Sequence, residues 1–456
     1  MTAGHTTAFP FSLPAQPEHA AIPPARADVV VIGGGIIGVM SAWYLRERGL
    51  SVVLCEKGRI AAEQSSRNWG WVRQQGRDPA ELPIMIESMR LWRGLAAEAG
   101  GDLGFRQTGV LYIANRPADL ARHEAWAKIG GEHGLDTRML SAAETRAMLR
   151  DPGDWPGGLA GGMWTASDAR AEPWIAVPAL ARALARRGAV VAEACAVRAL
   201  DIAGGRVAGV VTERGRIACD TVVLAGGAWS ALFLGRHGVT IPQLSVLSSA
   251  AATVPLPEHF AGAAVDRHLA FRRRADGGYT LAPGDFHEVF LGPDALRHAR
   301  RFLPHVLADP PGHRILSAAP AGYPDAWRTA RHWGTEEVTP FEQVRILDPR
   351  PNPRALARAA EAFGRAFPTL GRPRLARAWA GMIDTMPDVV PVVDQMPDLP
   401  GLVVATGFSG HGFGIGPGMG RVVADVVAGR AAGHDLSRFR FARFSDGSKP
   451  VVGPAL

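Results

Sequence analysis

The first strongly patterned part of the chain is residues 28–56, where two short apolar runs flank one amphipathic segment. Val29–Ile32 is an uninterrupted apolar run with the length of a buried strand, and Val52–Leu54 is a second. Three consecutive glycines follow the first run and lead into the segment with helical periodicity. The order of strand, glycine-rich turn, helix and strand predicts a βαβ unit.

A membrane-spanning helix is the main alternative for this region. Residues 29–45 carry no charge, and their length is at the lower edge of what crosses a bilayer. The row of glycines and the strand pattern before it favour the βαβ unit. We therefore expect no transmembrane segment here.

Apolar periodicity and turn residues predict further elements along the chain. Helices are predicted at Pro79–Ala99, 117–130, 141–149, Pro173–Arg187, 294–307, 354–366 and about 418–428. Strands are predicted at Gly109–Ala114, within Ala189–Ala225, at Leu269–Arg273 and Tyr279–Ala282 around an Asp276–Gly278 turn, and at Leu402–Thr406. A glycine-rich loop, Gly407–Gly418, is predicted between the last strand and the last helix.

The order of these elements predicts a nucleotide-binding domain assembled from separated segments, with a second domain inserted into it. The fold class is therefore α/β plus α+β, with an antiparallel sheet in the inserted domain. The predicted boundaries are 28–100, 155–238 and 375–436 for the nucleotide-binding domain, 101–154 and 239–374 for a substrate domain, 1–27 for a disordered extension and 437–456 for a C-terminal tail.

Length and composition are those of an ordinary soluble enzyme. The 456 residues, 47% of them hydrophobic, suffice for two cores. Residues 1–27 are rich in Pro and Ala and lack a signal-peptide pattern, so we expect a cytoplasmic location or peripheral association with a membrane. The widely spaced Cys55, Cys195 and Cys219 predict free thiols and no metal site.

The net charge of +7 raises the question of nucleic acid binding. Arginine supplies nearly all the positive charge, since lysine occurs only three times, and the arginines are interleaved with Asp and Glu. The densest cluster, Arg272–Arg274, is not part of a basic run with interspersed aromatic residues. We therefore expect a solvated surface and no nucleic acid partner.

The glycine-rich turn carries the first candidate chemistry. Gly33 allows the tight turn, Gly35 lets a pyrophosphate approach the backbone, and Gly38 allows helix and strand to pack closely. The helix N-terminus presents unpaired N–H groups to the phosphates. Glu56, at the end of the second strand, is placed to accept hydrogen bonds from ribose hydroxyls. A chance glycine turn is the alternative, but the complete unit predicts binding of an adenine dinucleotide.

Two further loops suit a ligand. Residues 63–71 place hydroxyls, an amide and a guanidinium close together, which fits a phosphate or a polar heterocycle. Gly410–Gly414 precede a predicted helix, whose N-terminus can stabilise negative charge on a ligand. The alternative for the second loop is a connection without a ligand. No second GxGxxG occurs there, which disfavours a separate nicotinamide site.

Six segments together resemble one family. They are VVVIGGGIIG, the acidic strand end Glu56, the SSRNWG loop, TVVLAGGAWS, WAGMIDTMPDVVPVV and GFSGHGFGIGPGMG, and they occur in the family's order over about residues 28–430. The chain resembles the FAD-dependent oxidoreductases of the D-amino-acid oxidase, glycine oxidase and sarcosine oxidase type. It is most similar in character to D-amino-acid dehydrogenase and to the β subunits of opine and sarcosine oxidases. The resemblance implies a glutathione-reductase-like Rossmann domain that binds FAD.

The resemblance also implies which residues contact FAD. No histidine lies between Glu56 and Gly70 and no cysteine follows Cys219, so we predict that the FAD is bound non-covalently. The implied cofactor contacts are Gly33, Gly35, Ile36, Gly38, Glu56, Lys57, Ser65, Ser66, Arg67, Asn68, Val197, Ala225, Gly226, Trp229, Gly381, Gly410, His411, Gly412, Phe413 and Gly414.

The substrate contacts are less determined, because Ile383 stands where relatives of the glycine oxidase type carry an arginine for the substrate carboxylate. Arg272 and Tyr279 are candidates to hold a carboxylate instead, and Asp384 could attract a cationic amine. His411 is a candidate for a direct role. Alternatively, Arg272 is a surface arginine, Asp384 is a turn or cap residue, and His411 serves only in packing. No general base is assigned.

The implied reaction is oxidation of the C–N bond of an amino acid or secondary amine by hydride transfer to flavin N5, followed by hydrolysis of the imine. D-amino acids, N-alkyl amino acids and opine-like compounds are the candidate substrates, and oxygen, a quinone or a partner protein is the acceptor. A homo- or hetero-oligomer is compatible with this. A tRNA-modification flavoprotein and an FAD-bearing subunit of a multi-subunit oxidase are the alternatives.

Overall fold

The computed structural model describes residues 16–448 and residue 451, apart from residues 151 and 309. One of its sheets consists of β1 (Val29–Ile32), β2 (Val52–Cys55), β9 (Val190–Ala192), β13 (Thr221–Leu224), β21 (Val392–Gln395) and β22 (Leu402–Thr406). The order is β21-β22-β13-β1-β2-β9, and every pair is parallel except β21 with β22. This confirms the predicted βαβ unit and the Rossmann architecture.

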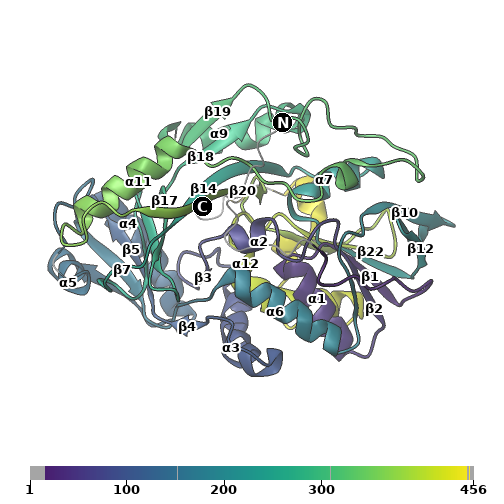
Figure 1. The fold of residues 1–456 in the computed structure, drawn as a ribbon, viewed down its shortest axis with the longest axis horizontal. Helices are drawn as coiled ribbons and strands as arrows, with labels where there is room; N and C mark the ends of the chain where they lie inside the picture. Colours follow the sequence, from purple (N-terminus) through teal and green to yellow (C-terminus); the bar gives the residue numbers. More distant parts are fainter. Residues whose placement is uncertain (1–15, 151, 309, 449–450, 452–456) are drawn as a thin grey trace.

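Helices cover one face of this sheet, and they are seen together in the lower part of Figure 1. They are α1 (Ile36–Glu47), α3 (Leu82–Ala99), α6 (Pro173–Arg186) and α12 (Gly412–Val427). Because side chains alternate along a strand, Val29 and Val31 face these helices, while Val30 faces the core on the other side. The strands are therefore apolar on both faces, as in buried parallel sheets.

Helix α12 differs from its prediction. It begins at Gly412 rather than at about residue 418, so the predicted loop was wrong for Gly412–Gly418. A Cβ on Gly416 would lie 2.5 Å from Ile36 Cγ1, and a Cβ on Gly420 would lie 2.5 Å from the carbonyl carbon of Met40. The glycines thus allow α12 to pack closely against α1 rather than forming turns.

The larger sheet has ten strands, nine of them in the order β19-β18-β14-β17-β16-β15-β5-β7-β6, with β20 paired to β14. Apart from the parallel pairs β5 with β15 and β18 with β19, its strands are antiparallel. The strands are β5 (Val110–Ala114), β6 (Thr137–Ser141), β7 (Gly161–Thr165), β14 (Leu244–Thr253), β15 (Ala263–Val265), β16 (Ala270–Arg273), β17 (Tyr279–Ala282), β18 (His287–Phe290), β19 (His313–Leu316) and β20 (Leu375–Thr385). The predicted antiparallel second sheet is confirmed, and Figure 1 shows it running along the upper and left part of the molecule.

Short elements connect and cover the two sheets. One three-stranded sheet contains β10 (Val197–Ala203), β11 (Arg206–Thr212) and β12 (Gly215–Ala218). A second three-stranded sheet contains β3 (Trp71–Val72), β4 (Arg106–Gln107) and β8 (Ala169–Arg170). The remaining α-helices are α2 (Gln64–Arg67), α4 (Pro117–Glu132), α5 (Ala142–Met148), α7 (Ser230–Arg236), α8 (Pro293–Arg297), α9 (Ala299–Ala308), α10 (Pro340–Gln343) and α11 (Pro353–Ala366).

Some segments differ from their predictions. Strands β7 and β20 come from ranges predicted for the nucleotide-binding domain but pair within the larger sheet. The helix predicted at 294–307 is two helices, α8 and α9, because the backbone of His298 leaves the helical conformation between them. The other predicted helices and strands are found at nearly the predicted bounds.

Both ends of the described chain contact the Rossmann part. Residues 1–15 of the predicted disordered extension lie outside the described residues, but residues 16–27 are in contact with the fold. Ala20 bridges to Ala192, and Arg26 bridges to Ala218. This corrects the prediction for residues 16–27. In the predicted C-terminal tail, Arg443 forms an ion pair with Asp388.

Candidate active site

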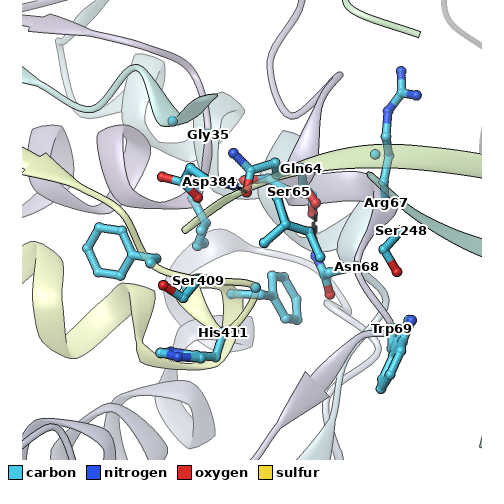
Figure 2. A pocket seen from close by; sticks show the side chains of 18 of the residues that line it. Gly35, Gln64, Ser65, Arg67, Asn68, Trp69, Ser248, Asp384, Ser409 and His411 are labelled. Atoms are coloured by element: carbon cyan, nitrogen blue, oxygen red, sulfur yellow. Dashed lines mark hydrogen bonds between the residues drawn. The ribbon is translucent and has the colours of Figure 1, made fainter. Parts of the chain in front are cut away.

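One cavity of about 650 Å³ runs from the carboxyl end of the parallel strands to the face of the larger sheet. Such a volume is typical of sites for cofactors and small ligands. Figure 2 shows its central part, where Gly35 and Ser65 lie near the start of α1, and Ser409 and His411 come from the segment between β22 and α12. Trp69 and Ser248 lie on the other side of the same view.

The glycine turn has the geometry of a pyrophosphate site. Gly33 has a φ of +113°, and a Cβ there would lie 2.3 Å from the carbonyl oxygen of Ala225. A Cβ on Gly38 would lie 1.9 Å from the carbonyl oxygen of Gly33, which explains the close approach of helix and strand. At Gly35 the only neighbour of a Cβ within 4 Å would be Ser65 Oγ, at 3.1 Å, so its backbone borders the cavity. The N-terminus of α1 is therefore open to an anion.

Glu56 holds this turn from the end of β2. Its carboxylate accepts hydrogen bonds from the backbone N–H of Gly34 and of Gly58, both at 2.7 Å. Burial raises the pKa of Glu56 to about 7, opposed by Lys57 and by the two N–H groups. Val197, which the resemblance implies as an adenine contact, lines the same end of the cavity.

A segment of the chain, residues 344–348, crosses next to this end of the cavity and is here named the clasp. The Lys57 ammonium donates to the carbonyl oxygens of Val344 and Arg345, at 2.8 and 3.0 Å, and also pairs with Glu63 at 2.6 Å. The backbone N–H of Leu347 donates to Glu63 at 3.0 Å. Because Lys57 and Glu63 both line the cavity, the clasp fixes two of its walls.

Ion pairs secure both ends of the clasp. The guanidinium of Arg345 forms two hydrogen bonds with the Glu213 carboxylate. Arg67, which is buried, donates to Asp348 and to the carbonyl oxygen of Ala380, both at 2.7 Å. The clasp belongs to the range predicted for the substrate domain. Its ion pairs therefore attach that range to residues on the cofactor side of the cavity.

The segment before α12 is held by Asp384. The Asp384 carboxylate accepts from the Gly407 N–H at 2.8 Å, and the Asp384 carbonyl accepts from the Ser409 N–H at 2.9 Å. Ser409 has a φ of +49°, an uncommon conformation for serine. Burial raises the pKa of Asp384, which disfavours the charged carboxylate needed to attract an amine. The geometry thus favours the turn-holding role over contact with a cationic amine.

Arg272 and Tyr279 are not among the residues that line the cavity, so both predicted carboxylate contacts are withdrawn. The Arg272 guanidinium is fully buried and forms two hydrogen bonds with Glu172, at 2.9 and 3.0 Å. The Tyr279 hydroxyl donates to the carbonyl oxygen of Phe260 within the core beneath the larger sheet. Neither residue can reach a ligand without rearrangement of that core.

Arg73 lines the cavity but is not among the site residues predicted from the sequence. The segment Trp69–Arg73, which contains the short strand β3, contributes Trp69, Trp71 and Arg73 to the cavity lining. The two indoles meet edge to face with ring centroids 5.4 Å apart, and the Arg73 guanidinium lies 5.7 Å from the centre of the Tyr112 ring.

His411 lines the cavity and is surrounded by buried charges. Arg77 donates to the His411 carbonyl oxygen at 2.8 Å, and His411 Nδ1 lies 3.4 Å from a Glu81 carboxylate oxygen without the alignment of a hydrogen bond. Burial, with further contributions from Arg77 and Arg73, lowers the pKa of His411 well below its ordinary value. The imidazole is therefore neutral at physiological pH.

Most residues implied as cofactor contacts border this one cavity. Three do not: Gly38 packs on Gly33, the Ser66 hydroxyl donates to the carbonyl oxygen of Glu63, and Gly414 accepts hydrogen bonds from Ser88 and Trp92. The implied cofactor contacts that do line the cavity are Gly33, Gly35, Ile36, Glu56, Lys57, Ser65, Arg67, Asn68, Val197, Ala225, Gly226, Trp229, Gly381, Gly410, His411, Gly412 and Phe413.

The fold and the site together define a flavoprotein oxidoreductase, because an adenine dinucleotide site continues into a cavity beneath a second sheet. The residues fit FAD, since the open helix N-terminus at Gly35 and the carboxylate of Glu56 match the needs of its pyrophosphate and ribose. The family of FAD-dependent oxidoreductases known as DAO matches residues 28–426. The chain belongs to this family and uses FAD.

Known proteins with similar sequence or structure act on amino acids and amines. Sarcosine oxidase subunit beta of Rhizobium meliloti is 26% identical over 434 residues, which are 93% of this chain and 90% of the relative. D-amino acid dehydrogenase of Paramagnetospirillum magneticum is 24% identical over 91% of this chain and 99% of its own. L-amino acid deaminase from Proteus myxofaciens, solved in complex with anthranilate, superposes with a TM-score of 0.87 and 30% identity over 94% of this chain and 95% of its own. The chain is thus an oxidoreductase of amino acids or amines.

The described residues contain neither a membrane-spanning helix nor a cluster of metal ligands. No helix among them has the length and apolar character needed to cross a bilayer. Within the same residues, His, Cys, Asp and Glu side chains do not gather in groups of three or more that could hold a metal ion. Cys55, Cys195 and Cys219 are free and buried.

Proposed function

We propose that the protein oxidises the C–N bond of an L-α-amino acid with bound FAD, and that Arg73 holds the substrate carboxylate. The observation that carries the proposal is the guanidinium of Arg73, which lines the cavity together with His411 and lies 5.7 Å from the centre of the Tyr112 ring. A guanidinium grips a carboxylate through two parallel hydrogen bonds. Since Arg272 is paired with Glu172, Arg73 takes over the role first considered for Arg272.

The chain's own groups would prepare the amino acid for reaction. Bound FAD would supply the hydride acceptor for oxidation at the α-carbon, and water would hydrolyse the resulting imine. Trp69 and Trp71 supply an apolar wall that excludes water from the substrate amine and favours its neutral form.

The stereochemical part of the proposal is supported by the comparisons. The L-amino acid deaminase from Proteus myxofaciens matches nearly the whole chain at 30% identity, whereas the D-amino acid dehydrogenase matches at 24%. Secondary amines are the second candidate class, because the sarcosine oxidase β subunit is 26% identical over 93% of this chain. If secondary amines are the substrates, the relative also suggests that the chain acts as a subunit of a larger oxidase.

The test is anaerobic reduction of the purified holoprotein with a panel of L-, D- and N-methyl amino acids. Loss of the flavin absorbance with L-amino acids, faster than with their D- and N-methyl counterparts, is the expected result. Reduction by N-methyl amino acids alone would show that secondary amines, and not L-α-amino acids, are the substrates. If no member of the panel reduces the flavin, the isolated chain does not have the proposed function.

We further propose that the FAD is releasable. Among the described residues, Cys55 is the cysteine that borders the cavity, and it lies at the end of β2 next to Glu56, on the nucleotide side. Acid precipitation should therefore leave the yellow colour in the supernatant. Colour that stays with the protein pellet after denaturation would show a covalent bond.

A further inference from the structure

The cavity does not end at Arg73 but continues to one face of helix α4. The residues of α4 that border it are Asp119, Arg122, His123, Ala125, Trp126 and Ile129. Apart from Ala125, their spacing of three or four residues places them on a single side of the helix. Lys128, which is exposed, does not border the cavity.

Helix α4 is fixed relative to the substrate region. The Trp126 indole N–H donates to the carbonyl oxygen of Arg77 at 2.9 Å, and Arg77 in turn donates to the His411 carbonyl oxygen. At the start of the helix, Asp119 accepts from the Arg116 N–H at 3.0 Å and from Arg122 at 2.7 Å. The cavity-facing side of α4 is thus linked to the segment before α12 through one intervening residue.

Beyond the Asp119–Arg122 ion pair at the start of α4, apolar and aromatic residues from three elements line this part of the cavity. Trp126 and Ile129 on α4 face the same space as Tyr112 and Ile113 on β5 and Met163 on β7. The rings of Tyr112 and His123 meet edge to face, 5.9 Å apart. Burial lowers the pKa of His123 to about 4, so its imidazole is neutral at pH 7 and adds no charge.

We propose that this face of α4 receives the substrate side chain and selects large apolar or aromatic amino acids, with Trp126 and Ile129 as specificity-determining residues. The inference rests on the proposed function, because it takes the carboxylate at Arg73 as its fixed point. A large apolar side chain would be withdrawn from water against Trp126, Ile129 and Met163. A charged side chain would lose its hydration there without a matching partner on these three residues.

The experiment compares wild type with Ile129→Trp, which fills the space, and with Lys128→Ala as a control on the outer side of the same helix. Two quantities are measured: the ratio of anaerobic flavin reduction (kred/Kd) by phenylalanine and alanine, and the Kd values of phenylacetate and acetate from the flavin absorbance change. Burial of a phenyl group predicts a wild-type preference of about tenfold or more for the larger member of each pair. Ile129→Trp should abolish both preferences without weakening acetate, and Lys128→Ala should leave them unchanged.

The binding measurement separates the two proposals. If no amino acid reduces the flavin, the proposed function fails, while the Kd ratio still decides whether the α4 face binds an apolar group. A wild-type ratio near one, or an Ile129→Trp variant with the wild-type ratio, overturns the inference about α4. Trp126→Phe, which keeps an aromatic ring but loses the hydrogen bond to Arg77, should retain part of the preference.

Discussion

The guanidinium of Arg272 forms two hydrogen bonds with the carboxylate of Glu172. The two residues come from separate parts of the chain, and both side chains are almost completely buried. A Cβ on Gly70 would lie 3.0 Å from Arg272 Cζ, so the pair sits directly behind the segment Trp69–Arg73. The pair therefore supports the wall that carries Trp71 and Arg73 rather than contacting a ligand itself.

Glu172→Gln should destabilise the protein far more than it affects ligand binding. Removing one charge of a buried ion pair leaves the other charge uncompensated, which costs about 3–5 kcal/mol. Urea denaturation measures the change in the free energy of unfolding. The matched control is Asp102→Asn, which breaks the exposed pair with Arg106 and should cost about 0–1 kcal/mol. Equal effects of the two substitutions would contradict the assigned supporting role.

Arg73→Met should weaken the binding of carboxylates without loss of FAD. Hydrogen bonds to charged groups contribute about 1.5–3 kcal/mol, so the Kd of acetate should rise about 10- to 100-fold. Arg93→Met, at an exposed arginine on α3, is the control for a general loss of positive charge. The flavin absorbance change on acetate addition gives both values. An unchanged Kd in the Arg73 variant would show that the carboxylate is held elsewhere.

FAD should bind more weakly as the pH falls below about 7. Burial raises the pKa of Glu56 to about 7 in the protein without FAD, and ribose hydroxyls donate to the ionised carboxylate. Below that pKa, binding must displace a proton, so the Kd should rise by up to about tenfold per pH unit, and above it the Kd should level off. Titration of apoprotein with FAD between pH 5.5 and 8 tests this. Glu56→Gln should bind with a Kd nearly independent of pH, and the wild-type slope in this variant would refute the assignment.

The clasp should control how long FAD stays bound. Glu213→Gln removes the ionic partner of Arg345, which lies outside the cavity, and should raise the rate of FAD loss about two- to tenfold. Dilution of holoprotein with detection of free flavin fluorescence measures that rate. Asp220→Asn, which removes the exposed partner of Arg26, serves as the control. If both variants release FAD at the wild-type rate, the clasp does not limit dissociation.

The sequence predicted the features that depend on neighbouring residues. Gly33 and Glu56 belong to one short βαβ unit, so their spacing alone defines a nucleotide site. The Arg272–Glu172 pair joins residues 100 positions apart, and only the pairing of the elements that carry them shows that Arg272 is already engaged. No local pattern contains that information.

Glycine-rich stretches were the second source of error. Gly416 looks like a loop residue in the sequence, but it lies inside α12, where it and Gly420 allow close contact with α1. A glycine needed for helix packing and a glycine needed for a turn look the same in a single sequence. Arg73 lies only two residues beyond the polar loop 63–71 that the sequence marked as a ligand site, so a slightly longer loop would have included it.

The most direct test of the account is a single anaerobic turnover with product analysis. Holoprotein is mixed with an excess of L-phenylalanine without an electron acceptor, and the reduced flavin, the 2-oxo acid and the ammonium are quantified. We predict one 2-oxo acid and one ammonium for each flavin reduced. In Arg73→Met the yield per flavin should be unchanged, but flavin reduction at subsaturating phenylalanine should be slower than in wild type. Flavin that stays oxidised with L-phenylalanine and every other α-amino acid would contradict the central claim.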